Sequence, residues 1–193
     1  MSWPALLIEA FAAAACQGNG AAVVRLDQPL PDKDLQAIAG SLRQSETAFL
    51  LQRDGAWLLR WFTPTCEVPL CGHATLAALL GLAHWGLLQP GASLEFWSRS
   101  GPLPVALDAA CSSQGSIVLP AAPLVDAVPS EELGQRLRAG TGQGISRYWT
   151  SGLGYHVALL PSGTGLDALD GLGAQLQGPE HQGLVVMAAV DPR

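Results

Sequence analysis

Residues 71 to 75 place a thiol, an imidazole and a hydroxyl within five positions, in the order Cys71-Gly72-His73-Ala74-Thr75. The apolar run that follows predicts a helix beginning here, and the first backbone N–H groups of a helix lack intrahelical acceptors. These donors lie at the positive end of the helix dipole, so a carboxylate can bind there without a charged side chain. We therefore expect an anion site at this helix start, with Thr75 adding a hydroxyl donor. The alternative is a tight turn whose donors bind water.

The imidazole of His73 falls in the first turn of this predicted helix. The dipole disfavours a second positive charge there, which predicts a neutral ring that donates a hydrogen bond to a ligand. A structural histidine bonded to a backbone carbonyl fits the pattern equally well. Cys66, Cys71 and His73 also offer three soft metal ligands, but their spacing fits no common zinc pattern and no fourth ligand is evident. We predict no metal site.

Glu46 is the carboxylate that these groups need for proton transfer. It follows Ser45 at the start of a predicted strand whose alternate residues are apolar. A carboxylate there is either solvated at the sheet edge or partly desolvated, and desolvation raises its pKa toward the range of a general acid/base near neutral pH. Its position relative to the helix start at 71–75 decides between these interpretations.

The composition limits the classes of partner. With 193 residues, of which 49% are hydrophobic and 13% charged, the chain can bury a core in one domain or two small ones. A formal net charge of −6 argues against nucleic acid and against an anionic membrane surface, which leaves a small molecule or a protein as the partner. Lys33 is the only lysine and lies between two aspartates, so Schiff-base chemistry has no good candidate and no cofactor is predicted.

The four cysteines, Cys16, Cys66, Cys71 and Cys111, show no disulfide-framework spacing, and the N-terminus lacks the basic region of a signal peptide. These features predict reduced thiols in a cytoplasmic protein. The segment Leu70–Leu88 approaches membrane-spanning length without a charged residue. Its histidines and glycines, its lack of basic flanks and the strand-like sequence on both sides favour a helix buried in a protein core.

The hydrophobic periodicity predicts an α+β fold, a strand-rich unit wrapped around this one apolar helix. Glycine, proline and Asp-Gly turns separate the expected strands, and Asp32 is expected to cap a helix that precedes the third of them. The expected strands of this first domain, residues 1–120, are 5–11, 21–26, 45–51, 56–63, 93–98, 103–108 and 115–119.

A second, smaller unit is expected after a Pro-rich linker at residues 121–129. Ser130 is a predicted N-cap, followed by two glutamates in the first turn of a short helix that ends near Arg138. A strand at 154–160, a helix near 166–177 and a strand at 183–190 complete the prediction. Because no central helix is evident, this partial domain, residues 130–193, is expected to be incomplete.

Three motifs together resemble the phenazine-biosynthesis (PhzF-like) isomerase family. They are Gly18-Asn19, then Ser45-Glu46-Thr47-Ala48-Phe49, and then Phe62-Thr63-Pro64 leading through Glu67 to Cys71-Gly72-His73-Ala74-Thr75. The resemblance covers residues 5 to about 120 well and the rest loosely. It implies a fold similar to diaminopimelate epimerase, in which two related units each wrap a mixed sheet around a central helix and the active site lies in the cleft between them.

The resemblance also implies cofactor-independent isomerisation of a small carboxylate-bearing metabolite. By position, Glu46 matches the family's proton-shuttling carboxylate, and Gly72 and His73 match its substrate-contacting pair. Cys71 aligns with a catalytic thiol of the related epimerases. A homodimer in the cytoplasm is the expected assembly. The further substrate-binding candidates are Ser45, Ala74 and Thr75, with Asn19 as another possible contributor.

Two features depart from the family pattern. The family usually has Gly-Asn-Pro where this chain has Gly18-Asn19-Gly20. The chain also stops at Arg193, before the family's second acidic motif, so the resemblance implies a complete first domain and a truncated second one. Either another chain supplies the other half of the pocket, or the protein is a truncated relative. The alternatives to an isomerase are a non-catalytic binding or interaction protein and a two-base racemase that pairs Cys71 with a second thiol.

Overall fold

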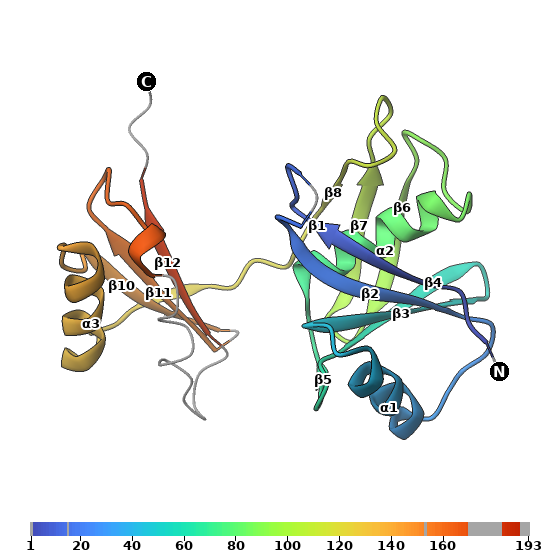
Figure 1. Cartoon of the computed structure of the whole chain (residues 1–193), viewed down its shortest axis with the longest axis horizontal. Coiled ribbons are helices and arrows are strands. Elements are labelled where there is room, and N and C mark those ends of the chain that lie inside the picture. The colour runs from blue at the N-terminus through green and yellow to red at the C-terminus, as the bar shows by residue number, and fades with distance from the viewer. Residues whose placement is uncertain (1, 15, 153, 170–182, 190–193) are drawn as a thin grey trace. The chain divides into compact units, whose positions relative to one another are not determined.

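One curled sheet of eight strands makes up most of the first compact unit, residues 1–120, in the computed structural model of the protein (Figure 1). The structure describes residues 2–14, 16–152, 154–169 and 183–189. The strands are β1 (Ala5–Ala10), β2 (Asn19–Leu26), β3 (Glu46–Arg53), β4 (Ala56–Phe62), β5 (Glu67–Val68), β6 (Ser93–Ser98), β7 (Gly101–Leu107) and β8 (Gly115–Ile117). They follow one another in the order β1-β2-β3-β4-β6-β7-β8, with β5 beside β4. The pairs β2–β3 and β4–β6 are parallel.

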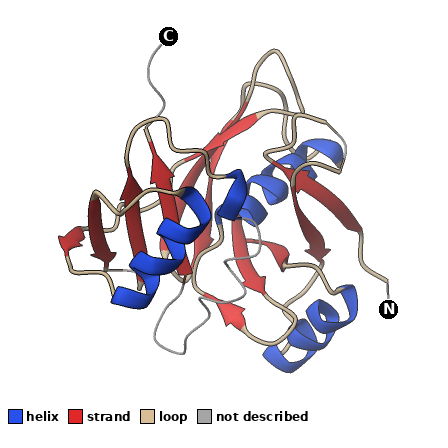
Figure 2. Ribbon diagram, turned by 60° about the vertical axis from the view of Figure 1, so that its left-hand side comes forward, coloured by secondary structure: helices blue, strands red, loops and turns tan. Residues whose placement is uncertain are grey.

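The helix α2 (Gly72–His84) has no polar face, and the sheet curls around it (Figures 1 and 2). It contacts β1, β2, β3, β7 and β8, and eight of its residues are buried. A helix that is apolar on all sides needs protein or lipid around it, and here the strands supply the protein. In the described part of the chain, no helix is long and apolar enough to cross a membrane. The predicted fold class, a mixed sheet around a central apolar helix, is confirmed.

The C-terminal end of α2 comes earlier than the apolar run suggests. The helix stops at His84, and Gly86 adopts a φ of +70°. The N–H of Gly86 donates to Ala83 and the N–H of Leu87 donates to Leu82, which satisfies carbonyls of the last turn. Residues 85–88 are therefore outside the helix, because a left-handed glycine ends it.

A second helix, α1 (Asp32–Leu42), packs its apolar stripe on the outer face of β2, β3 and β4. It has the expected position and length, but the expectation that Asp32 caps it was wrong. The residue before the helix is Pro31, and no side chain makes a cap hydrogen bond. The carboxylate of Asp32 instead accepts a hydrogen bond from Arg60 Nη1 at 2.8 Å. A guanidinium is a stronger partner for a carboxylate than a neutral N–H group.

The sheet register decides which strand ends meet. The β3–β4 hairpin turns at Asp54 and Gly55, whose φ values of 52° and 81° match the expected Asp-Gly turn. Glu46 of β3 lies opposite Ala21 in the parallel β2–β3 pair, and the next residue of β3 lies opposite Phe62. The first residues of β2 and β3 and the last residues of β4 therefore lie at one end of the sheet.

The second compact unit, residues 121–193, is described by itself. Its four-stranded sheet runs in the order β12 (Gly183–Ala188), β11 (Tyr155–Leu160), β10 (Arg147–Ser151), β9 (Leu124–Asp126). The helix α3 (Glu131–Thr141) and the short 3-10 helix η1 (Asp167–Leu169) pack on one face of this sheet. Ser130 caps α3 as expected, because its side chain accepts a hydrogen bond from the N–H of Leu133.

Three expectations for this unit are corrected or limited by the structure. The expected linker at 121–129 contains β9, which pairs with β10 and so satisfies backbone groups that a linker would expose to water. The strand β10 itself was not expected, because its five residues, RYWTS, do not alternate between apolar and polar types. The helix expected near 166–177 is a 3-10 turn at Asp167–Leu169, and the part from residue 170 onward lies outside the described residues.

Candidate active site

The sheet register brings Glu46 to the start of α2. Glu46 is the first residue of β3, at the same end of the sheet as the last residue of β4. From there the chain passes through β5 and begins α2 at Gly72. The carboxylate of Glu67 in β5 accepts hydrogen bonds from Arg60 at 2.7 Å and pairs with Arg99 at 2.6 Å, which fixes this connection. The site predicted from two separate motifs is therefore one place in the fold.

The imidazole of His73 is the centre of the cluster. Its Nε2 atom lies 3.1 Å from Glu46 Oε2 and 3.2 Å from Ser45 Oγ, and the Ser45 hydroxyl also donates to the carbonyl of Gly20 at 3.0 Å. The side chain of His73 is 11% exposed and that of Glu46 is 20% exposed. Both side chains are thus largely withdrawn from water, with a small part of each still exposed.

Cys71 holds the other side of the same ring. Its Sγ atom lies 3.4 Å from His73 Nδ1, and the residue is 8% exposed. Cys71 precedes the first helical residue and is extended, with φ −148° and ψ 112°, and it makes no side-chain cap hydrogen bond. Both ring nitrogens of His73 are therefore engaged, and a thiol, an imidazole and a carboxylate form one hydrogen-bonded chain.

The backbone donors at the helix start are fewer than expected. The N–H and the hydroxyl of Thr75 both bind the carbonyl of Cys71, at 3.1 Å and 2.5 Å, and Thr75 is fully buried. The expectation that Thr75 offers a hydroxyl to a ligand was therefore wrong, because that hydroxyl closes the first turn of the helix. No acceptor in the described part of the chain binds the N–H groups of Gly72, His73 and Ala74. These three groups remain as the anion-binding donors.

The remaining candidates differ in how they can contribute. A Cβ on Gly72 would lie 3.3 Å from Leu119 Cδ1, so glycine keeps this helix start close to its apolar neighbours. Ala74 is fully buried, which leaves only its N–H group as a possible contact. Asn19 is exposed at the start of β2, one residue before Gly20, and its side chain makes no hydrogen bond within the described residues. The structure therefore brings Ser45, Glu46, Cys71 and His73 together. Asn19 is connected to them only through the next residue, Gly20, whose carbonyl accepts a hydrogen bond from Ser45.

The charge state of the cluster differs from both sequence expectations. Hydrogen bonds to Cys71 and to Glu46 raise the pKa of His73 to about 9, so the ring is an imidazolium at neutral pH and the expectation of a neutral ring was wrong. The hydrogen bond from His73, helped by Ser45, holds the pKa of Glu46 below its usual range despite partial burial. Glu46 is thus neither a solvated edge residue nor a carboxyl group with a raised pKa. Two specific partners outweigh the helix dipole and the desolvation.

We expect an NMR titration of the histidine ring protons to place the pKa of His73 well above 6.5, with the Glu46→Gln variant moving it down. A group whose pKa is raised on folding stabilises the fold most below its unfolded value, here 6.5, and loses that contribution as the pH rises through about 9. The contribution of Glu46 has the opposite sign, being present above about 4.5 and lost as the pH falls. The histidine signal that is missing from the spectrum of His73→Asn is the signal of His73. A midpoint at or below 6.5 would contradict the paired geometry.

One candidate ligand atom from each of Glu46, Cys71 and His73 lies within 4.8 Å of the other two, a spacing that can hold a cation. Because His73 uses Nδ1 toward Cys71 and Nε2 toward Glu46, a cation would have to replace one of these hydrogen bonds. Cys66 is the third possible metal ligand named from the sequence, beside Cys71 and His73. Its sulfur lies 3.4 Å from Thr63 Oγ1. The prediction of no metal site stays a prediction.

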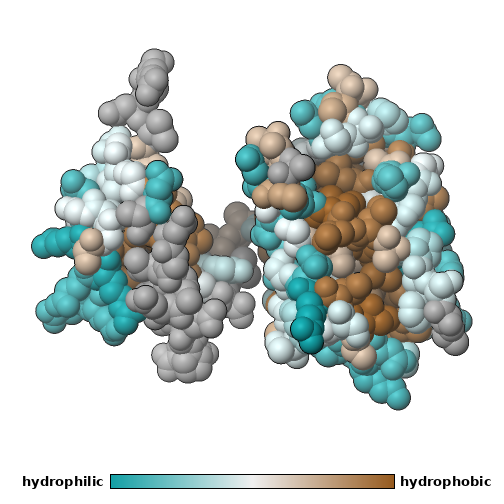
Figure 3. Space-filling view, viewed as in Figure 1, coloured by the Kyte–Doolittle hydropathy of each residue, from teal (hydrophilic) through white to brown (hydrophobic). Residues whose placement is uncertain are grey.

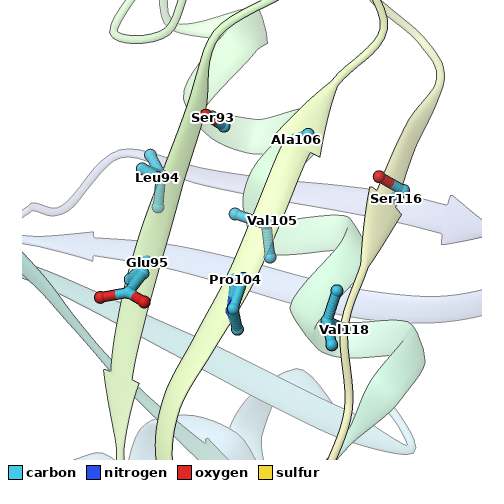
Figure 4. Close-up of a pocket in the computed structure, with 8 residues that line it drawn as sticks. All are labelled: Ser93, Leu94, Glu95, Pro104, Val105, Ala106, Ser116 and Val118. Atoms are coloured by element: carbon cyan, nitrogen blue, oxygen red, sulfur yellow. The ribbon is translucent and has the colours of Figure 1, made fainter.

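Two hollows lie away from this cluster. A groove of about 300 Å³ lies over β6, β7 and β8, and Figure 4 shows one carboxylate, Glu95, among its lining side chains, with no imidazole or thiol. A pocket of about 290 Å³ in the second unit contains Tyr148 hydrogen-bonded to His156 Nδ1. The sequence did not single out this pair, because its partners lie on different strands and only the β10–β11 register brings them together. Neither hollow contains a carboxylate beside an imidazole and a thiol.

Comparison with known proteins places this cluster in a family context. The family model for phenazine biosynthesis-like proteins (PhzC-PhzF) matches residues 8–153. An uncharacterized isomerase of Pseudomonas aeruginosa is 53% identical over 98 residues, which are 51% of this chain and 38% of that protein. The human phenazine biosynthesis-like domain-containing protein is 40% identical over 111 residues, 53% of this chain and 38% of that protein. The chain thus matches well under half the length of these curated relatives.

Solved structures show the same relationship. A phenazine biosynthesis protein of the PhzF family from Enterococcus faecalis superposes with a TM-score of 0.68 at 29% identity, covering 99% of this chain and 70% of that chain. A hydroxyproline epimerase from Agrobacterium vitis superposes with a TM-score of 0.58 at 12% identity, covering 87% of this chain and 53% of that chain. The second likeness concerns the fold alone.

Proposed function

Because the chain belongs to the phenazine biosynthesis-like protein family, we propose that it is a cofactor-independent isomerase of a small carboxylate-bearing metabolite. The observation that carries the proposal is the 3.1 Å contact between Glu46 and His73 at a helix start with open backbone donors. A base and an anion-binding group lie within the span of one small substrate. That is the arrangement needed to move a proton next to a carboxylate.

In the proposed reaction the substrate carboxylate binds the N–H groups of Gly72, His73 and Ala74. Glu46, which is ionised in the resting site, takes a proton from a carbon of the substrate, and the electrons of the broken C–H bond move into the conjugated carboxylate. The helix start and the imidazolium of His73 stabilise the developing negative charge. The acid form of Glu46 exchanges its proton with water through its exposed surface and returns a proton to another carbon. One proton is taken and one is returned, so no oxidant or cofactor is required.

The His73–Glu46 pair also tunes the base. A carboxylate held by an imidazolium is a weak base, since the bond favours its ionised form. A substrate oxygen that takes over the His73 hydrogen bond would remove part of this stabilisation and make Glu46 more basic. Glu46 would then become competent only when the site is filled.

The assembly is also part of the proposal. Apolar side chains gather over the middle of the first unit in the view of Figure 3, and Leu7 on the edge strand β1 is 65% exposed. Such a face fits contact with a second copy or with a complementing chain that completes the pocket. Light scattering on the purified protein tests this expectation. A cytoplasmic location with four reduced cysteines likewise stays a prediction.

A non-catalytic binding or interaction protein is the second candidate. In the described residues of the second unit, both helices pack on one face of the sheet, and Tyr155, Val185 and Met187 are exposed large hydrophobic residues. A two-thiol racemase has less support, since the cluster around Cys71 contains no other cysteine among the described residues. The sulfur of Cys111, for example, lies against Ser113 Oγ at 3.1 Å.

The proposed isomerase can be tested by incubating the protein in D2O with β,γ-unsaturated carboxylates, beginning with but-3-enoate, and with 2-amino carboxylates. An isomerase is expected to place deuterium on the γ-carbon of an unsaturated member, and NMR or mass spectrometry locates it. Deuterium on the α-carbon of a 2-amino carboxylate with inversion would instead support the racemase. Binding of a member without any exchange would contradict the isomerase and support the binding protein.

A further inference from the structure

Two apolar side chains lie against the helix start that would bind the carboxylate of the proposed substrate. A Cβ on Gly72 would lie 3.3 Å from Leu119 Cδ1 and 3.8 Å from Ile117 Cδ1. Because Gly72 has no side chain, both methyl groups come close to its backbone. Leu119 is 41% exposed, so part of its surface is available to a ligand held on the N–H group of Gly72.

The end of β8 sets the direction of these side chains. β8 stops at Ile117, but the N–H of Val118 still donates to the carbonyl of Pro104 at 2.9 Å, so the chain stays beside β7. Side chains alternate between the two faces of a strand. Ile117 and Leu119 therefore share the face toward α2, whereas Val118 lies in the groove of Figure 4 on the other face.

The groups around the helix start differ in polarity according to the strand from which they come. Glu46 of β3 lies 3.1 Å from His73, and within the described residues His73 is its ion-pair partner. From β8 and the residues after it, the atoms that approach Gly72 are methyl groups. A second charged group of a ligand placed against Leu119 would lose water without gaining a hydrogen-bond partner, whereas a hydrocarbon group would gain contact.

We propose that Leu119, together with Ile117, determines the specificity of the proposed site and selects monocarboxylates whose α- and β-carbons carry hydrocarbon. The carboxylate binds the N–H groups at the helix start, and the carbon chain packs on the methyl groups of Leu119. Full burial of a methylene raises affinity about fourfold, so a side chain that stays partly exposed should raise it about two- to threefold. The proposal rests on the carboxylate-binding helix start of the proposed function, but not on proton transfer by Glu46.

Saturated carboxylates test this specificity, because they can bind without reacting. The 15N-labelled protein is titrated with acetate, propanoate, butanoate and succinate at constant ionic strength, and the amide signals of Gly72, His73 and Ala74 give the dissociation constants. Affinity is expected to rise about two- to threefold with each methylene from acetate to butanoate. Succinate has a carboxylate where butanoate has its methyl group, and it is expected to bind at least about threefold more weakly than butanoate.

Variants of two neighbouring residues make the outcome specific. Leu119→Asn keeps nearly the same size, and it is expected to reduce the gain to below about 1.5-fold per methylene and to remove the preference for butanoate over succinate. Val118→Asn is the matched control, because this side chain is 61% exposed and lies on the face away from α2. It is expected to keep both the gain and the preference.

Four results would each overturn the proposal. They are a flat series in the wild-type protein, a series that Leu119→Asn leaves unchanged, an equal loss in Val118→Asn, and succinate binding more tightly than butanoate. The isomerase test is separate. Deuterium incorporation into but-3-enoate together with a flat series would remove this inference alone, and a rising series without any deuterium incorporation would remove the proposed isomerase alone.

Discussion

Replacing Glu46 with glutamine is expected to slow deuterium incorporation into a responsive substrate by about 10²- to 10⁴-fold, the usual contribution of a positioned general base. Glutamine keeps the shape and a hydrogen-bond acceptor toward His73, but it cannot take a proton from carbon. The initial rate in D2O, followed by NMR with the substrate that the wild-type protein exchanges fastest, measures the effect. Because Glu46 is only partly buried, the fold should survive the substitution.

The matched control is Glu95→Gln. Glu95 is a carboxylate on a strand of the same unit, but it lies exposed in the groove of Figure 4 over β6 and β7. Its substitution removes one negative charge without touching the cluster, and the exchange rate is expected to stay within about twofold, as for most surface changes. If Glu46→Gln leaves the rate of deuterium incorporation into the substrate unchanged, Glu46 is not the base, whatever the control shows.

Replacing Leu79 with alanine is expected to destabilise the first unit by about 2–5 kcal/mol, the range for large-to-small changes in a core. Leu79 lies on α2, has no exposed surface, and packs so closely on β8 that a Cβ on Gly115 would come within 2.6 Å of its Cδ2 atom. The cavity would lie in the middle of the enclosed helix, where the surrounding strands cannot easily collapse. Hydrogen exchange of the α2 amides should accelerate by about 30- to 5,000-fold under conditions where exchange follows opening.

Leu7→Ala provides the comparison, because it removes the same atoms from a side chain that is 65% exposed on β1. Its effect is expected to stay below about 1 kcal/mol. If the hydrogen-exchange rates of the α2 amides in Leu79→Ala stay within about threefold of the wild-type rates, the helix is not the core around which the unit is built.

The two predictions concern the same helix from different ends. The apolar body of α2 holds the sheet together, and its start carries the chemistry at Cys71, Gly72 and His73. A loosened helix would also move its first turn relative to Glu46, so Leu79→Ala should slow deuterium incorporation into the substrate as well as weaken the fold. Glu46→Gln should slow deuterium incorporation too, but it should leave the hydrogen exchange of the α2 amides nearly unchanged. Amide exchange therefore separates the two variants.

The sequence by itself determined most elements of the first unit and the location of the site motifs. An apolar run without a polar face can only be a core or membrane helix, and the strand-like sequence around it favoured the core, which the fold confirms. Seven of the eight strands of the first unit and the Asp54-Gly55 turn follow from local periodicity and turn chemistry, which act over a few residues, whereas the two-residue strand β5 was not expected. The motifs around Glu46 and His73 pointed to the family for the same reason, since each is a short local pattern.

The tertiary structure alone decided how these motifs act on one another. The distance from Glu46 to His73 depends on the β2–β3 and β3–β4 registers, and the charge of both groups depends on that distance. Local reasoning gave His73 a neutral ring from the helix dipole, but a thiol and a carboxylate on its two nitrogens make it an imidazolium. It also offered the hydroxyl of Thr75 to a ligand, whereas the hydroxyl binds the carbonyl of Cys71. The charge and the hydrogen bonds of a side chain depend on its neighbours in space. A single sequence identifies those neighbours only where they are also close along the chain.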